Sequence, residues 1–255
     1  MTSASRAGTF RARVAELPPV LTNTLEHNLA RVRQGIVDAA RSAGRAPEAV
    51  ELVAVTKTVD AETALALAAL GATELGENRV DELERKSALF RSASVPCRWH
   101  FVGHVQTNKA ARIAACADVV HSVDSVRLVE TLDRNASHVG RSLGVYLQVK
   151  LHPEANKSGL DPLDLADAVL AVRAASSLRW CGLMTMAPLV ADEVRARELA
   201  DDVFARLATL GREHGSPGLS MGMSDDYALA IQHGSTCVRI GSALFEGLST
   251  RRIGA

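Results

Sequence analysis

The feature that most constrains the fold is a regular alternation of short apolar runs with amphipathic helical patterns. The first run covers residues 50–56, and a helical pattern over residues 61–70 follows it and stops at Gly71. Continuous apolar runs are typical of parallel strands buried on both faces, and each such strand needs a helix to return the chain. About eight units of this kind follow one another in the 255 residues. They predict an α/β protein with a single (β/α)8 barrel, a fold that typically needs ~250 residues.

The remaining units have similar lengths. Further strands are expected at residues 72–75, 98–102, 119–122, 144–150, 178–184, 219–221 and 237–240. Further helices are expected at residues 79–90, 108–116, 126–135, 164–174, 192–214, 225–233 and, as a last short one, 243–248. The competing architecture, an open doubly wound sheet, more often has a glycine-rich fingerprint after its first strand. The first strand here ends at Lys57 without a glycine, which favours the barrel.

An additional helix precedes the barrel. Apolar residues recur at helical spacing over residues 21–43, and Gly44 follows as a C-cap. We expect a flexible tail at residues 1–20 and one barrel domain at residues 21–255. Residues 1–13 contain three arginines and no acid, a composition also found in transit peptides. A short mobile tail is the preferred interpretation, since termini are often loosely held.

Composition excludes several classes of protein. Lys plus Arg and Asp plus Glu are both 29, so the formal net charge is +0 and the basic excess of a nucleic-acid-binding protein is missing. No apolar run reaches ~18 residues, so we expect no membrane-spanning helix. The four cysteines are widely spaced and form no C-x-x-C pair, which predicts reduced thiols and a cytoplasmic protein.

In a barrel the chemistry lies where strands end, and Lys57 ends the first strand. At the rim of the barrel interior, a poorly hydrated amine has a lowered pKa and can attack a carbonyl to form a Schiff base. A lysine at a strand end can equally extend to solvent without any chemical role. Lys57 alone does not decide between these alternatives.

The last two loops indicate an anion site. Ser224 is expected to cap the helix at residues 225–233, Gly241 lets a ligand approach the backbone, and Ser242 adds a hydroxyl donor. Barrel enzymes often bind phosphate in these loops. Asp225 and Asp226 would weaken an anion site, and Ser224 can serve as a cap alone.

Arg239 lies between two apolar residues of the last strand, where a charge needs a partner or a ligand. An amine, a phosphate cradle and an arginine together meet the needs of pyridoxal phosphate. An arginine at the ring nitrogen would not give up its proton, so the pyridine would stay neutral and withdraw electrons less strongly.

Seven segments carry a resemblance to a known family. They are 53–57 (VAVTK), 76–78 (GEN), 99–109 (WHFVGHVQTNK), 157–159 (KSG), 182–184 (GLM), 220–226 (SMGMSDD) and 234–242 (GSTCVRIGS). In this order they resemble the YggS/PROSC family of pyridoxal phosphate homeostasis proteins, which is related to the barrel domain of alanine racemase. The resemblance runs from about residue 21 to residue 248.

The resemblance implies a set of residues around pyridoxal 5'-phosphate. Lys57 would hold the cofactor as an internal aldimine, and Arg239 would face the ring nitrogen. The other implied contacts are Asn78, Met184, Met223, Ser224, Gly241 and Ser242, with His100 and Lys157 as secondary candidates. Many family members have a second lysine where Val59 stands here, so a cofactor relay that depends on that lysine is in doubt.

The family is associated with control of the free cofactor pool, without an established turnover reaction. The resemblance therefore implies a carrier or regulator whose partners are apo-enzymes that accept pyridoxal phosphate. The sequence does not extend into the second domain of alanine racemase, which favours a monomer. The alternative is an amino-acid racemase, which needs a tyrosine base; Tyr146 and Tyr227 do not match that role by motif. No metal site is expected, because His100 and His104 lie in a strand and a loop rather than on one helix face.

Overall fold

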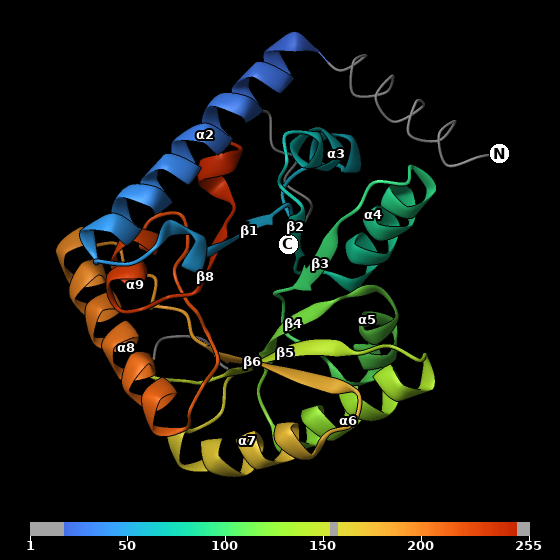
Figure 1. Cartoon of the computed structure of the whole chain (residues 1–255), viewed down its shortest axis with the longest axis vertical. Coiled ribbons are helices and arrows are strands. Elements are labelled where there is room, and N and C mark those ends of the chain that lie inside the picture. Colours follow the sequence, from blue (N-terminus) through green and yellow to red (C-terminus); the bar gives the residue numbers. More distant parts are fainter. Residues whose placement is uncertain (1–17, 154–157, 249–255) are drawn as a thin grey trace.

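The computed structural model describes residues 18–153 and 158–248, in which eight parallel strands form one closed barrel (Figure 1). The strands are β1 (Glu51–Val55), β2 (Glu74–Glu77), β3 (Arg98–Phe101), β4 (Val119–Val123), β5 (Leu143–Gln148), β6 (Leu178–Met184), β7 (Leu219–Ser220) and β8 (Cys237–Ile240). Each strand pairs with the next along the chain, and β1 closes the ring by pairing with β8. The predicted fold class is confirmed.

Helices surround the barrel, one after each of the first seven strands (Figure 1). They are α3 (Ala61–Ala69), α4 (Val80–Ser92), α5 (Ala110–Cys116), α6 (Val126–His138), α7 (Leu165–Ala174), α8 (Glu193–Glu213) and α9 (Tyr227–Gln232). The helix predicted at residues 243–248 is wrong, because between β8 and residue 248, the last described residue, the chain forms a 3-10 turn at Ser242–Leu244 and no α-helix.

The preceding helix α2 (Pro19–Ser42) covers the seam between the last and first units (Figure 1). It packs against α9, α3 and the turn after β8, and Asn28 donates hydrogen bonds to the carbonyls of Leu244 and Glu246. The helix therefore stands where a full helix after β8 would otherwise lie. It begins at Pro19, two residues before the predicted start at residue 21, and residues 1–17 of the expected tail lie outside the described residues.

Strand β2 lies two residues later than predicted, at Glu74–Glu77 instead of 72–75. The prediction ended the strand before Gly76 because glycine usually weakens a strand. Here a Cβ on Gly76 would lie 3.2 Å from the side chains of both Val53 and Val55. Glycine therefore permits close packing inside the barrel, and Glu77 becomes a strand residue.

The barrel interior has its own core, separate from the larger core between strands and helices. Its buried members are Val53, Val55, Val119, Tyr146, Met184 and Cys237. Side chains thus fill the barrel, as expected for eight parallel strands. Fully burying a large apolar side chain contributes roughly 1.5–3 kcal/mol.

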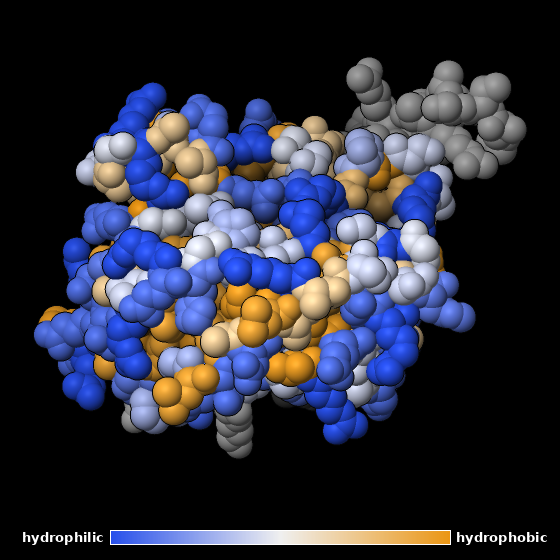
Figure 2. Space-filling model, turned by 60° about the horizontal axis from the view of Figure 1, so that its bottom comes forward, coloured by the Kyte–Doolittle hydropathy of each residue, from blue (hydrophilic) through white to orange (hydrophobic). Residues whose placement is uncertain are grey.

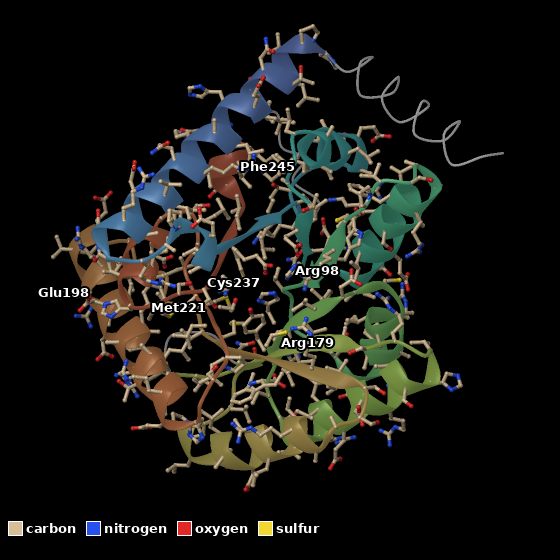
Figure 3. All side chains as sticks on the ribbon, viewed as in Figure 1. Arg98, Arg179, Glu198, Met221, Cys237 and Phe245 are labelled. Atoms are coloured by element: carbon tan, nitrogen blue, oxygen red, sulfur yellow. The ribbon has the colours of Figure 1, made fainter. Side chains whose placement is uncertain are left out.

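Charged residues begin several strands and gather at the N-terminal end of the barrel. The Arg98 guanidinium lies 3.5 Å from the Glu51 carboxylate and 3.3 Å from that of Glu74. In Figure 3, Arg98 and Arg179 lie around the middle of the ring of strands together with Cys237. These ion pairs therefore lie at the end of the barrel opposite to Lys57, which follows the C-terminal end of β1.

Hydrophobic residues on the face in Figure 2 are interrupted by hydrophilic ones. The exposed large apolar side chains include Leu163, Leu170, Leu189 and Val194. Exposed apolar residues of this kind are common on protein surfaces. Within residues 18–153 and 158–248, no helix combines the length and apolar character that crossing a bilayer requires.

Candidate functional site

Lys57 lies just beyond the C-terminal end of β1, at the barrel mouth. The backbone N–H of Thr56 donates to the carbonyl of Gly76 over 2.8 Å, so the loop that carries Lys57 lies beside the end of β2, where Asn78 follows. Both Lys57 and Asn78 are exposed. Of the two alternatives for Lys57, the structure shows the one in which the side chain reaches solvent.

A buried ion pair that the sequence analysis missed holds the Lys57 loop. The Lys86 ammonium of α4 lies 2.5 Å from the Glu77 carboxylate, and both side chains are 0% exposed. Lys86 also donates to the carbonyls of Thr56 and Val59, each over 2.8 Å. These two carbonyls flank Lys57, so a cation without solvent contact fixes both ends of its loop.

Two loops meet at the proposed anion site. The Ser224 hydroxyl accepts a hydrogen bond of 3.3 Å from the backbone N–H of Ala243, which joins the loop after β7 to the turn after β8. The backbone N–H groups of Ser224 and Ser242 have no hydrogen-bond partner among the described residues. A Cβ on Gly241 would lie 3.4 Å from the Val55 carbonyl, an ordinary contact distance, so the cradle lies next to β1.

The helix that follows begins later than predicted, and Ser224 does not cap it. Asp226 occupies the N-cap of α9, and its carboxylate accepts the backbone N–H of Met223 over 2.5 Å. Burial raises the pKa of the Asp226 carboxyl above its usual value. Asp225, the other acid of this loop, is exposed.

Arg239 of β8 is 5% exposed and points into the barrel. Its guanidinium donates to the Ser220 hydroxyl over 2.5 Å and to the Thr185 carbonyl over 3.0 Å. Burial lowers the pKa of Arg239, an effect that nearby Cys237 and Asp226 partly offset. It forms no ion pair with a carboxylate in the described part of the chain, so its charge has no direct counterion there.

A line of polar side chains leads from Arg239 into the barrel. His121 of β4 lies 2.8 Å from the Ser220 hydroxyl, and its other ring nitrogen lies 2.8 Å from His100 of β3. The second nitrogen of His100 lies 2.7 Å from the Glu74 carboxylate. The sequence analysis missed this line, although three of these residues interrupt apolar strands in the same way as Arg239.

The other predicted residues occupy different places. Met184 ends β6 and is 1% exposed within the inner core. Met223 lines a groove of about 650 Å³ between the loop after β6 and α9. His100 is fully buried with both ring nitrogens engaged by protein groups. Lys157 lies outside the described residues.

The described residues contain one group that could ligate a metal, at the N-terminal end of the barrel. Glu51, Glu74 and His100 place one ligand atom each within 4.8 Å of one another. The Arg98 guanidinium contacts both carboxylates, so these two acids already have a positively charged partner within the protein. His104 instead lies 3.6 Å from Asp124 and is exposed, so it does not join His100.

The chain is similar to a known family and to several curated proteins. The chain matches the family described as "Alanine racemase, N-terminal domain" over residues 22–249. It is 41% identical over 225 residues to the pyridoxal phosphate homeostasis protein of Pseudomonas aeruginosa, covering 88% of this chain and 95% of that protein. It is 36% identical to the protein of the same name in Escherichia coli K12, covering 88% of this chain and 96% of that protein.

Solved structures of related proteins have a similar fold. A structure of PipY from Synechococcus elongatus with PLP bound is 35% identical, has a TM-score of 0.73, and is matched over 87% of this chain and 99% of that one. The structure of PipY without PLP has a TM-score of 0.75 at 36% identity, with the same coverage. Alanine racemase from Corynebacterium glutamicum, at 19% identity and a TM-score of 0.62, covers 90% of this chain and 64% of its own and shows the shared fold alone.

The closed barrel and the family match over residues 22–249 define a protein of the alanine racemase N-terminal domain class. Curated relatives at 35–41% identity match nearly their whole length. The chain belongs to the family of pyridoxal phosphate homeostasis proteins, and the resemblance predicted from its motifs is confirmed.

Proposed function

We propose that this protein binds pyridoxal 5'-phosphate at the C-terminal mouth of the barrel and acts in homeostasis of that cofactor. One observation carries the proposal: the buried Arg239 guanidinium has no carboxylate partner among the residues described. A buried charge without a counterion is costly, and a ligand that accepts a hydrogen bond compensates for it. The pyridine nitrogen of the cofactor is such an acceptor.

The residues at the mouth fit the other parts of the cofactor. The exposed Lys57 supplies the amine for a covalent link, and Asn78 lies at the neighbouring strand end. The free N–H groups of Ser224 and Ser242, next to Gly241, supply donors for the phosphate. When bound, pyridoxal phosphate supplies an electrophilic aldehyde and an electron-withdrawing ring.

Arg239 favours holding the cofactor over turning substrates over. An arginine keeps its protons at any physiological pH, so the pyridine nitrogen facing it stays unprotonated. An unprotonated ring withdraws electrons weakly and stabilises a carbanion poorly. A site of this kind suits a protein that stores or delivers the cofactor.

The racemase alternative has less support. Tyr146 lies inside the barrel with its ring stacked on His121, and burial raises the pKa of its hydroxyl. The Tyr227 hydroxyl lies against Gly35 of α2, on the outer layer. Neither tyrosine therefore supports a second base opposite Lys57, and we expect slow or absent alanine racemisation by purified protein.

The first experiment tests the covalent link. Purified protein mixed with pyridoxal phosphate should develop the visible absorbance of the lysine-bound cofactor, and borohydride reduction should leave the cofactor on Lys57. Lys57→Ala should lose both signals. Lys150→Ala is the matched control, because Lys150 follows β5 at the same end of the barrel; loss of the signals in this control instead would contradict the assignment.

The second experiment tests the phosphate cradle. Combined Ser224→Ala and Ser242→Ala should weaken pyridoxal phosphate binding by roughly a hundredfold or more, since each hydroxyl that bonds a charged group contributes about 1.5–3 kcal/mol. Pyridoxal, which lacks the phosphate, should bind the variant nearly as well as it binds the wild type. Equal losses for both ligands would count against the cradle.

The homeostasis role implies a protein that keeps the cofactor available to apo-enzymes, as a monomer in the cytoplasm. Loaded protein should activate an apo-enzyme in the presence of a scavenger that removes free pyridoxal phosphate. Lys57→Ala protein treated in the same way should not. Size-exclusion chromatography with light scattering measures the oligomeric state, and a dimer would contradict that part of the proposal.

A further inference from the structure

Five side chains form an unbroken hydrogen-bonded line through the barrel. Successive polar atoms of Glu74, His100, His121, Ser220 and Arg239 lie 2.7, 2.8, 2.8 and 2.5 Å apart. The residues come from β2, β3, β4, β7 and β8, so strands far apart around the ring contribute. The two histidines and Ser220 are 0% exposed, which excludes solvent from the middle of the line.

The two ends of the line determine its direction. A guanidinium only donates hydrogen bonds, so Ser220 must accept from Arg239. At the other end, burial alone would raise the pKa of Glu74, but its contacts with His100 and Arg98 outweigh burial and lower that pKa. Glu74 is therefore ionised at neutral pH and only accepts hydrogen bonds.

The groups between the ends can then be paired in one way without adding a proton. Burial, with smaller effects from His100 and Arg239, lowers the pKa of His121 well below its usual value, so its ring is neutral. Ser220 donates its hydroxyl proton to Nδ1 of His121, and Nε2–H of His121 donates to Nδ1 of His100. Nε2–H of His100 then donates to Glu74.

The opposite direction would need an extra proton. If His121 donated from Nδ1 to Ser220, its Nε2 would have to accept from Nδ1 of His100. His100 would then need a second proton to reach Glu74, which creates a buried imidazolium. The Glu74 carboxylate already has a cation within 3.3 Å, the Arg98 guanidinium, so it does not require this second charge.

We propose that Glu74, His100 and His121 are positioning residues that act through Ser220, forming a one-directional relay that orients the Arg239 guanidinium for the cofactor ring. The relay makes Ser220 an obligatory acceptor for one Arg239 nitrogen, while the Thr185 carbonyl accepts from the other. Two fixed acceptors restrict rotation of the guanidinium. The part that concerns the cofactor rests on the proposed function.

The direction of the relay is tested without cofactor. Nitrogen NMR of histidine rings in wild-type protein at neutral pH should show both His100 and His121 as neutral Nε2–H tautomers. A proton on Nδ1 of His121, or a charged His121 ring, would overturn the relay. Glu74→Leu removes the terminal acceptor, and His121 should then lose its single tautomer; an unchanged spectrum of His121 in this variant also contradicts the relay.

The effect on the cofactor is tested with paired variants. His121→Gln can still accept from Ser220 and donate to His100, whereas His121→Phe keeps only the ring that stacks on Tyr146. His121→Phe should weaken pyridoxal phosphate binding about tenfold, since it leaves a buried polar partner unpaired, and His121→Gln should restore most of it. Tyr146→Phe is the control, because it keeps the stacked ring outside the relay.

The outcomes separate the two claims. Wild-type affinity in His121→Phe, or an equal loss in His121→Gln, refutes the positioning role. If wild-type protein binds no pyridoxal phosphate, the proposed function fails, and the tautomers still decide whether the relay exists. If His121→Phe does not fold, Glu74→Leu at the partly exposed end of the line provides the second measurement, with weakened binding expected and unchanged binding contradicting the relay.

Discussion

The buried pair of Lys86 and Glu77 leads to the sharpest prediction about this fold. Lys86→Met keeps the length of the side chain and removes its charge. It leaves the Glu77 carboxylate without its cation in a site with 0% exposure, where one of its oxygens, Oε2, already has no hydrogen-bond partner among the described residues. Removing one partner of a buried ion pair costs about 3–5 kcal/mol.

The loss should be visible in thermal unfolding. For a chain of this size, each kcal/mol lowers the melting temperature by about 2–4 °C, so Lys86→Met should melt roughly 6–20 °C below wild type. The matched control is Arg85→Met on the same helix. Arg85 pairs with Glu82 over 2.7 Å at the surface, with side chains 50% and 21% exposed, and such pairs contribute at most about 1 kcal/mol.

A double variant isolates the charge interaction. Adding Glu77→Gln to Lys86→Met removes the stranded carboxylate while keeping an acceptor for the Thr56 hydroxyl, which bonds Glu77 over 2.5 Å. The double variant should lose about 1–3 kcal/mol less than the two single variants together. The reasoning is refuted if Lys86→Met is no more destabilising than Arg85→Met. Lys86 also donates to the carbonyls on both sides of Lys57, so the Lys86→Met substitution should weaken cofactor binding as well.

Two further predictions concern single positions. Gly76→Ala places a methyl group 3.2 Å from Val53 and Val55 and should destabilise the fold by about 1–3 kcal/mol in chemical denaturation, and a neutral effect would show that the barrel wall can move. Asp226→Asn should raise stability at pH 7, because the raised folded-state pKa of Asp226 favours its protonated form, so its ionisation destabilises the fold as pH rises through that pKa. The advantage of Asp226→Asn should shrink as pH falls toward about 4, the ordinary pKa of an aspartate, and a constant difference across this range would contradict the sign.

Much of the fold followed from local patterns. Apolar runs alternating with amphipathic helices predicted a closed barrel with a preceding helix, because parallel strands need both faces covered. The same pattern placed Lys57, Asn78, Ser224 and Ser242 beyond strand ends, and all four lie at the barrel mouth. Boundaries were less certain, as β2 and the segment after β8 show, since both depend on contacts with other elements.

Interior polar contacts were largely beyond the sequence. A lysine in a helical pattern usually predicts a solvent-facing position, yet Lys86 is one of the buried residues of α4. Its partner Glu77 is brought to it only by the tertiary structure. A partial signal existed for the histidines, because His100 and His121 interrupt apolar strands as Arg239 does. Their connection through Ser220 required the closed ring, which brings β4 within reach of β7 across the interior.

The sequence by itself determined the order of elements, the ends of strands that carry chemistry and the family, because these depend on periodicity and on residues close along the chain. The tertiary structure alone decided which charges are paired, that Lys57 is exposed, and which groups Arg239 contacts. Those properties depend on distances between residues far apart in the chain, and only closure of the barrel brings such residues within hydrogen-bonding range.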